Sequence, residues 1–315
     1  MDELKKENLK RIVIEVLPLI TTVIVVVFFQ ITTNGRLLSA NNIRVLINQI
    51  FTVLMISLGA IFVYAHGNMD LSIGGMVGCG MLLGVLAVNA TSSILVGFLV
   101  ILVFCSGIGF ANGAMQALFK ERPFLPTVGM MFVLRAIVTY AGNIQTFRIS
   151  SDYAVYDNTI LKIAALVIVA LLSLYLFDFT KIGKFQKLMG GNIVAAQQLG
   201  VNIIKYKMWA YTLTGVYSAV AAFFAMVRAR AVVAESGDGL QFDVLIALIF
   251  GGMPLSGGTK ARYLAAIFGA VIVTVLRNGL IIWGLNTGTV ALVRAIIFMI
   301  LVSANYKRTK GILPR

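Results

Sequence analysis

The sequence predicts an all-α fold, a polytopic membrane bundle of about ten transmembrane helices with both termini in the cytoplasm. The 315 residues are 59% hydrophobic and only 12% charged, and the mean hydropathy is +0.95. A soluble domain has about 25% charged residues, so this chain has too little polar surface to cover itself in water. Apolar runs of about 20 residues, the length that spans a bilayer as a helix, recur along it. The whole chain, 1–315, is predicted to form one transmembrane domain.

The predicted spans follow from these runs, taken in chain order. Eight are of spanning length: 12–31, 43–66, 71–90, 94–117, 124–142, 160–177, 207–227 and 263–283. Two are less regular, because 243–256 is short and ends in a Gly/Pro cluster and 284–304 carries Arg294. All ten should be helical, since lipid offers no partner to an unpaired backbone group. The first is interpreted as a span because no small-residue signal cleavage site clearly follows it.

The basic residues set the predicted orientation. The formal net charge is +14. With ten spans and a cytoplasmic N-terminus, seventeen Lys and Arg fall inside and six outside, which fits the positive-inside rule. The seventeen include Lys120 and Arg122 after the fourth span and Lys307 and Arg308 after the tenth. The positive balance therefore indicates topology and attraction to anionic membrane lipid, and no nucleic acid partner is expected.

Two segments interrupt the apolar pattern with glycines and polar residues. One, 67–75, carries Asn68, Asp70 and Ser72, and the other, 251–258, carries Pro254 and Ser256. Broken helices in transporters expose backbone groups to a polar cavity, so these residues are predicted to contribute to a pathway or gate. The alternative is two ordinary turns, with Asp70 and Ser72 capping the helix that follows.

Single residues within the spans add to this picture. Arg135 lies near the middle of its span and is predicted to line a pathway or form a buried pair, because a charge at that depth is costly. Arg277 lies near a helix end and is expected to extend its guanidinium to the interface. His66 is interpreted as an interfacial residue at a helix end. Glycines spaced by four, such as Gly109 and Gly113, favour close helix packing.

The longest cytoplasmic loop, 178–206, contains a short predicted helix. Asn192 is a suitable N-cap and Gly200 a suitable stop. A helix of two or three turns is not stable alone in water, so it should pack against the bundle or against a cytoplasmic partner.

This segment resembles the coupling helix of bacterial ABC importer permeases for ribose, galactose and xylose, a family related to branched-chain amino acid permeases. The matching positions are Gly191, Asn192, Ala195, Ala196 and Gly200. Three further segments are similar to family motifs and occur in the expected order: 68–74, 123–130 and 251–258. The chain departs from the family at Ile193-Val194, where Pro-Glu is common, at Asn68, where Gly is common, and at Met253-Pro254.

The resemblance implies a permease subunit in the bacterial cytoplasmic (inner) membrane that translocates a monosaccharide or similar small polar solute. It implies partners: cytoplasmic ATP-binding cassette ATPase subunits, an extracytoplasmic solute-binding protein, and a second permease copy in a homodimer or heterodimer. The chain lacks the Gly-x-x-x-x-Gly-Lys-Ser/Thr phosphate loop, so ATP is expected to be used by the partner. No cofactor, metal or catalytic residue is predicted.

The residues offer little support for two other classes of function. An ion-coupled secondary transporter would need intramembrane carboxylates along a relay, and only Asp70 approaches that role. A membrane enzyme would need a Ser/His/Asp set or a metal-ligand cluster, and the chain has one histidine. Within the importer family, a nucleoside, a signalling furanose or an amino acid remains an alternative solute.

Overall fold

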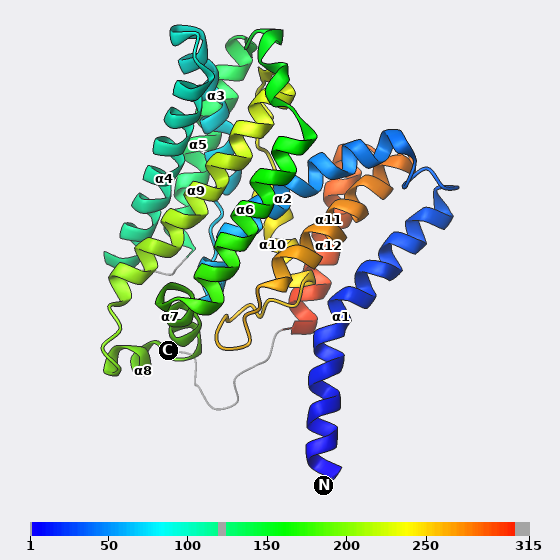
Figure 1. Cartoon of the computed structure of the whole chain (residues 1–315), viewed down its shortest axis with the longest axis vertical. Helices are drawn as coiled ribbons and strands as arrows, with labels where there is room; N and C mark the ends of the chain where they lie inside the picture. Colours follow the sequence, from blue (N-terminus) through cyan, green and yellow to red (C-terminus); the bar gives the residue numbers. More distant parts are fainter. Residues whose placement is uncertain (1, 119–123, 306–315) are drawn as a thin grey trace.

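The computed structural model describes residues 2–118 and 124–305 (Figure 1). Lys120, Arg122, Pro123, Lys307 and Arg308, which entered the predictions above, lie outside the described residues. The helices are α1 Asp2–Thr32, α2 Ala40–Ala65, α3 Ile73–Thr91, α4 Ile94–Leu118, α5 Leu125–Ile144, α6 Thr159–Leu174, α7 Lys181–Gly191, α8 Ile193–Gln198, α9 Ile203–Ala229, α10 Leu240–Phe250, α11 Leu264–Ile282 and α12 Thr287–Asn305.

Shorter elements complete the chain. A 3-10 turn covers Ser151–Tyr156, and a π-helical turn, Tyr175–Phe179, extends α6. Strands β1 Phe147–Arg148 and β2 Ala231–Val232 pair antiparallel. Within the described residues this two-residue ladder is the only sheet, so the prediction of an all-α bundle is confirmed.

The helices coincide with the predicted spans. Seven described helices are long and apolar enough to cross a membrane, and three shorter apolar helices lie at Val16–Thr32, Leu240–Phe250 and Thr287–Ile300. The span predicted over 243–256 is wrong at its end, because α10 stops at Phe250 and a turn follows. The Gly/Pro cluster after Phe250 accounts for this, since Gly and Pro do not sustain a helix.

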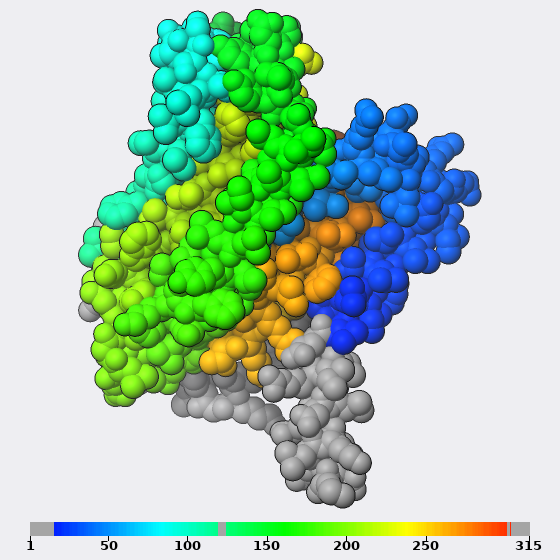
Figure 2. All heavy atoms as spheres, viewed as in Figure 1, coloured from blue at the N-terminus to red at the C-terminus, as the bar shows by residue number. Residues whose placement is uncertain are grey.

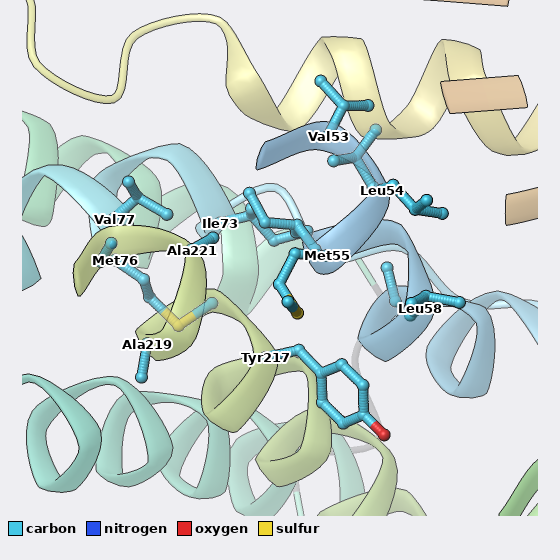
Figure 3. Close-up of a cluster of buried hydrophobic side chains, with 14 of the residues drawn as sticks. Val53, Leu54, Met55, Leu58, Ile73, Met76, Val77, Tyr217, Ala219 and Ala221 are labelled. Carbon is cyan, nitrogen blue, oxygen red and sulfur yellow. The ribbon is translucent and has the colours of Figure 1, made fainter. Parts of the chain in front are cut away.

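The core lies where α2, α3 and α9 meet. Figure 3 shows Met55 and Leu58 of α2, Met76 of α3 and Tyr217 of α9 converging on this contact. Met55, Leu58 and Met76 are fully buried. By contrast, α4, α5 and α6 keep most of their apolar surface exposed, as expected of helices that face lipid.

Glycine allows α4 to approach α9 closely. A Cβ at Gly109 would lie 2.3 Å from the Tyr211 carbonyl oxygen, and one at Gly215 would lie 2.2 Å from the Cys105 carbonyl oxygen. Any side chain there would force the helices apart. The packing role predicted for Gly109 and Gly113 is confirmed, since a Cβ at Gly113 would lie 2.7 Å from the Met208 Cα.

The bundle has two distinct ends. The β1–β2 ladder follows α5 and α9 directly and marks one of them, the hairpin end. The short helix α8 precedes α9 and lies at the opposite end, at the lower left of Figure 1; we call this the α8 end. The space-filling view shows α1 (blue) seated against α11 (orange), which closes one flank (Figure 2).

Candidate functional site

The segment between α2 and α3 is irregular and yet buried. Asn68 is 6% exposed, and Asp70 and Ser72 are completely buried. A buried loop is unusual, because its backbone and side-chain polar groups need partners inside the protein. The structure therefore places these three predicted site residues in a polar break inside the bundle.

Two neighbouring helices hold this break in place. Asp70 Oδ1 accepts hydrogen bonds from the Ser72 amide (3.0 Å) and the Ser72 hydroxyl (2.7 Å). Asn112 of α4 donates to Ser72 Oγ at 2.8 Å, and the Tyr211 hydroxyl of α9 donates to the Met69 carbonyl at 3.2 Å. The Ser72 side chain makes no capping bond to α3, so the capping alternative is wrong for Ser72.

Several polar atoms around the break have no hydrogen-bond partner among the described residues. They are Asp70 Oδ2, Asn112 Oδ1, Asn68 Nδ2 and the Tyr64 hydroxyl. Buried polar groups are normally served by a protein group or by water. The break is thus chemically suited to hydration, in contrast to the apolar core beside it.

The second interrupted segment packs directly on the first. The Gly258 amide donates to the Ala65 carbonyl at 2.8 Å. Gly67 and Gly257 both have positive φ, and a Cβ at Gly67 would lie 2.7 Å from the Ser256 carbonyl oxygen. Pro254 closes the turn by accepting a hydrogen bond from the Gly257 amide at 2.9 Å. The structure brings together the two segments that carry Asn68, Asp70, Ser72, Pro254 and Ser256.

The end of α7 touches this junction. A Cβ at Gly190 would lie 2.2 Å from the Ala65 carbonyl oxygen and 2.5 Å from the Gly258 nitrogen. Gly190 is followed by Gly191 and Asn192, where α8 begins. The backbone just before α8 is thus in direct contact with the backbone beside both interrupted segments. A displacement of α8 is therefore expected to move both segments.

Helix α8 forms where the sequence predicts it. Asn192 Oδ1 accepts from the Val194 and Ala195 amides at 3.0 Å each, and Gly200 has a φ of +77°. Ala196 is fully buried against Met189 and Val201, whereas Gly191, Asn192 and Gly200 are exposed and Ala195 is half-buried.

Sequence reasoning overlooked three exposed apolar side chains on α8 and directly after it. Val194 is 56% exposed and Leu199 71% exposed, and Ile193 beside them is also exposed. Exposed apolar groups that cluster on a short loop helix mark an interaction surface. Their helical positions between polar residues were the available signal.

His66 follows α2 at this junction and is 8% exposed. Its Nδ1 lies 3.1 Å from the Phe62 carbonyl oxygen, which places the proton of the neutral ring on Nδ1. Burial, and to a smaller extent the charge of Lys207, lower the pKa of His66 to about 4. The ring is therefore neutral at physiological pH. His66 lies at the end of α2 as expected, and its side chain is buried within the protein.

Arg135 lies apart from this junction, towards the hairpin end. Its guanidinium is 3.5 Å from the Asp238 carboxylate and 3.5 Å from the Ser236 carbonyl oxygen. The structure thus gives Arg135 a charged partner, on the loop between β2 and α10.

A group of three charges was not foreseen from the sequence. Asp243 of α10 is 1% exposed and accepts from Arg277 of α11 at 2.9 Å. Arg294 of α12 forms an ion pair with its other carboxylate oxygen. The expectation that Arg277 extends to the interface is wrong, because a buried carboxylate supplies a nearer counter-charge. An acid at the start of a short apolar segment was the only signal.

The sequence matches a known family over the same elements. The family described as branched-chain amino acid transport system / permease component matches residues 42–304, which include both interrupted segments and α8.

Individual relatives are similar over most of their length. The ribose import permease protein of Escherichia coli K12 is 24% identical over 287 residues, 88% of this chain and 89% of that protein. The galactofuranose transporter permease protein of the same organism is 28% identical over 295 residues, 89% and 84%. The fructose import permease protein of Rhizobium meliloti is 26% identical over 308 residues, 91% and 83%.

Proposed function

This chain belongs to the branched-chain amino acid transport permease family, and on that premise we propose that it is the membrane subunit of an ATP-driven importer of a monosaccharide. The single observation that carries the proposal is the contact of Gly190 with Ala65 and Gly258. It joins the end of α7, which leads directly into α8 and its exposed apolar side chains, to both breaks in the bundle, and transmission of force from an ATPase requires such a link.

The proposed mechanism is a shift between two bundle conformations. ATPase subunits would bind the exposed apolar side chains of α8 and of the residue that follows it, Ile193, Val194 and Leu199. A partner that binds the two conformations unequally shifts their populations. Movement of α8 would displace the junction of Gly67 and Gly257 and change access to the hydrated break around Asp70. These residues move and gate the solute, and ATP hydrolysis belongs to the partner.

The proposed setting is the bacterial inner membrane, with the α8 end in the cytoplasm and the hairpin end outside. This orientation is supported by the basic residues near α8, which include Lys181, Lys184 and Lys205. A solute-binding protein would deliver the sugar to the hairpin end. A second permease copy, as homodimer or heterodimer, would complete the assembly.

A sugar is favoured as solute because three relatives are named for ribose, galactofuranose and fructose. The test is uptake of these radiolabelled sugars into proteoliposomes that contain the permease, its ATPase and its binding protein. ATP-dependent uptake is expected, and competition with nucleosides and amino acids tests the alternative solutes. Uptake that persists without the ATPase, or that an uncoupler abolishes at constant ATP, contradicts the proposal.

A further inference from the structure

A cavity of about 300 Å³ lies towards the hairpin end, away from the junction of the two breaks. It is enclosed by α2, α3, α9, α10 and α11 and by the loop before α10. We call it the hairpin-end cavity. The residues that matter below are Thr52, Arg228, Glu235, Asp243, Thr274 and Arg277. Its volume is at the lower end of the range for small-molecule sites, about 300–1,000 Å³.

The wall of the cavity carries both hydrogen-bond donors and acceptors. Arg228 and Arg277 are donors, whereas Glu235 and Asp243 are acceptors. Arg228 and Glu235 are exposed at the mouth, and their side chains make no hydrogen bond or ion pair with any described residue. A single bound ion would meet both attraction and repulsion here. A neutral polyol is matched, because each of its hydroxyl groups both donates and accepts.

The buried end of the cavity holds a hydroxyl group without a partner. Thr274 is 2% exposed, and its Oγ1 has no hydrogen bond to any described residue. A helical threonine commonly bonds to the carbonyl four residues earlier, as Thr52 does to Asn48 at 3.1 Å on the opposite wall. Thr274 instead leaves its hydroxyl unpaired and shielded just behind the cavity lining. A change of χ1 rotamer, which a helical threonine allows, turns the hydroxyl towards the cavity.

Ion pairs with neighbouring residues fix the positions of the charged groups in the lining. Asp243 binds Arg277 and is itself bound by Arg294 of α12. Only one of the guanidinium nitrogens of Arg277 bonds to a described residue, which leaves donors for a ligand. Arg135 likewise holds Asp238 at the mouth.

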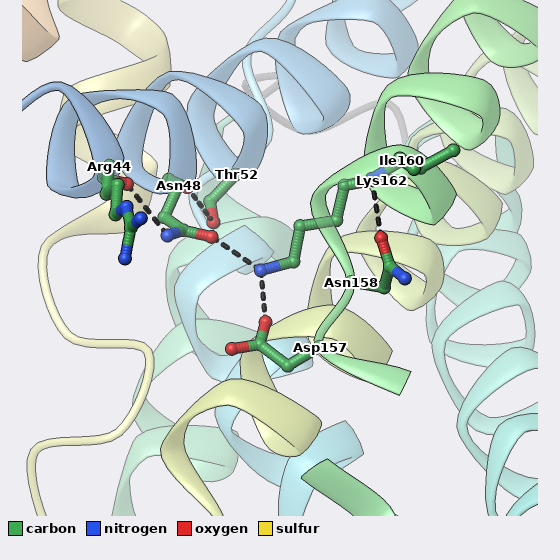
Figure 4. Close-up of polar contacts among 7 residues, drawn as sticks. All are labelled: Arg44, Asn48, Thr52, Asp157, Asn158, Ile160 and Lys162. Carbon is green, nitrogen blue, oxygen red and sulfur yellow. Dashed lines mark hydrogen bonds and ion pairs between the residues drawn. The ribbon is translucent and has the colours of Figure 1, made fainter. Parts of the chain in front are cut away.

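A second polar group stands near the mouth. Figure 4 shows Lys162 of α6 pointing between Asp157 and Asn48, and Asn48 lies one turn from Thr52 on α2. Lys162 is 4% exposed. Its hydrogen bond to Asn48 ties the start of α6 to α2 and so fixes one wall of the cavity.

We propose that the hairpin-end cavity is a binding station for the monosaccharide inside the permease, where Arg277, Glu235 and Thr274 bond to its hydroxyl groups. This inference rests on the proposed function and adds a site to it. Arg277 donates, Glu235 accepts, and Thr274 bonds to the part of the sugar that enters deepest. Asp243 and Arg294 are positioning residues, since they act through Arg277.

The variant Thr274→Val separates this role from a structural one. Valine has the same shape, and it removes a buried hydroxyl that has no partner in the protein, so the melting temperature of the sugar-free permease should be unchanged or higher. If the hydroxyl serves only the fold, uptake should be unchanged as well. If it binds sugar, uptake should fall about tenfold, the effect of one lost hydrogen bond of ordinary strength.

The experiment measures ATP-dependent uptake in complete proteoliposomes for wild type, Thr274→Val, Glu235→Gln and Thr212→Val. Thr212 is a matched control, because it is half-buried, lies near the α8 end of α9 and bonds to Met208. We expect reduced uptake in the two cavity variants and wild-type uptake in the control. A Thr274→Cys variant adds a direct reading, since saturating sugar should slow its modification by a thiol reagent; Cys79 and Cys105 are both buried.

The outcomes distinguish the two proposals. Wild-type uptake of a sugar together with full activity of both cavity variants and no sugar protection of Thr274→Cys overturns the binding station and leaves the proposed function standing. Absence of sugar uptake by the wild-type assembly overturns the proposed function, and the sugar assignment of the cavity with it.

Discussion

The amide of Gly258 donates a 2.8 Å hydrogen bond to the carbonyl of Ala65, and this bond joins two breaks almost 200 residues apart in the chain. Gly190 is in close contact with the same two residues. Three chain segments thus meet at one point where each contributes backbone and no side chain. Such a contact transmits displacement, because packed backbones have little freedom to yield.

Substitution of Gly190 by alanine should loosen this junction. The added Cβ would lie 2.2 Å from the Ala65 carbonyl oxygen, and overpacking of this kind costs about 1–3 kcal/mol. We expect a lower melting temperature of the purified permease and less ATP-dependent uptake. Gly191→Ala is the matched control, because a Cβ there meets nothing within 4 Å, and its melting temperature should equal that of wild type. Equal stability of the two variants would contradict the prediction.

The exposed apolar side chains of α8 and Leu199 should bind the ATPase. Leu199→Ser and Val194→Ser should weaken the permease–ATPase complex about tenfold or more, since each removes an apolar side chain that binding would bury. The fold should be unaffected, because both side chains are exposed. Binding is measured by titration of labelled ATPase onto permease in nanodiscs. Val155→Ser, at an exposed apolar position of the hairpin end, is the control, and wild-type affinity in Leu199→Ser would refute the assignment.

The ion pairs of Asp243 should depend on which partner is removed. Asp243→Ala leaves Arg277 and Arg294 close together without their shared carboxylate, and loss of one partner from a buried pair costs about 3–5 kcal/mol. Arg294→Met should cost less, because Arg277 still neutralises Asp243. Thermal unfolding in detergent measures both. Asp238→Asn breaks the exposed pair with Arg135, where Asp238 is 59% exposed, and should cost at most about 1 kcal/mol. A larger loss of stability in Arg294→Met than in Asp243→Ala would contradict the central role of the Asp243 carboxylate in these ion pairs.

His66 should make stability fall with acidification. Its pKa is lowered by burial to about 4 in the folded protein from about 6.5 when unfolded. The unfolded state therefore binds more protons between these values, and the stabilising contribution, complete above about pH 6.5, is lost as pH falls towards about 4. The melting temperature of wild type should drop more steeply over this window than that of His66→Gln. Parallel pH profiles would mean that His66 is protonated equally in both states.

Local pattern was sufficient for most of the fold. Most spans could be placed within a few residues, because hydropathy and length are properties of contiguous sequence. The exceptions are the start of α1 and the end of α10. The cap at Asn192 and the stop at Gly200 were likewise predictable, since both depend on neighbours two or three residues away.

For the sites, the sequence indicates which residues are unusual but not which of them are in contact. Asn68, Asp70, Ser72, Pro254 and Ser256 stand out as interruptions, and yet nothing local indicates that their two segments touch. Arg277 was assigned to the interface because its partner, Asp243, is 34 residues away on another helix. Pairing of this kind depends on how the helices pack. The local sequence around Arg277 does not indicate which helix will lie beside it.

The sequence by itself determined that this is a helical membrane bundle and which family it belongs to. Membrane insertion can be read in this way because the burial of backbone groups in lipid constrains every span separately. The tertiary structure alone decided that Gly190, Ala65 and Gly258 form one contact and that charged residues of α9, α10 and α11 surround one cavity. These features arise from side chains and backbones brought together over long chain distances, where close packing selects one arrangement from many that the same pattern allows.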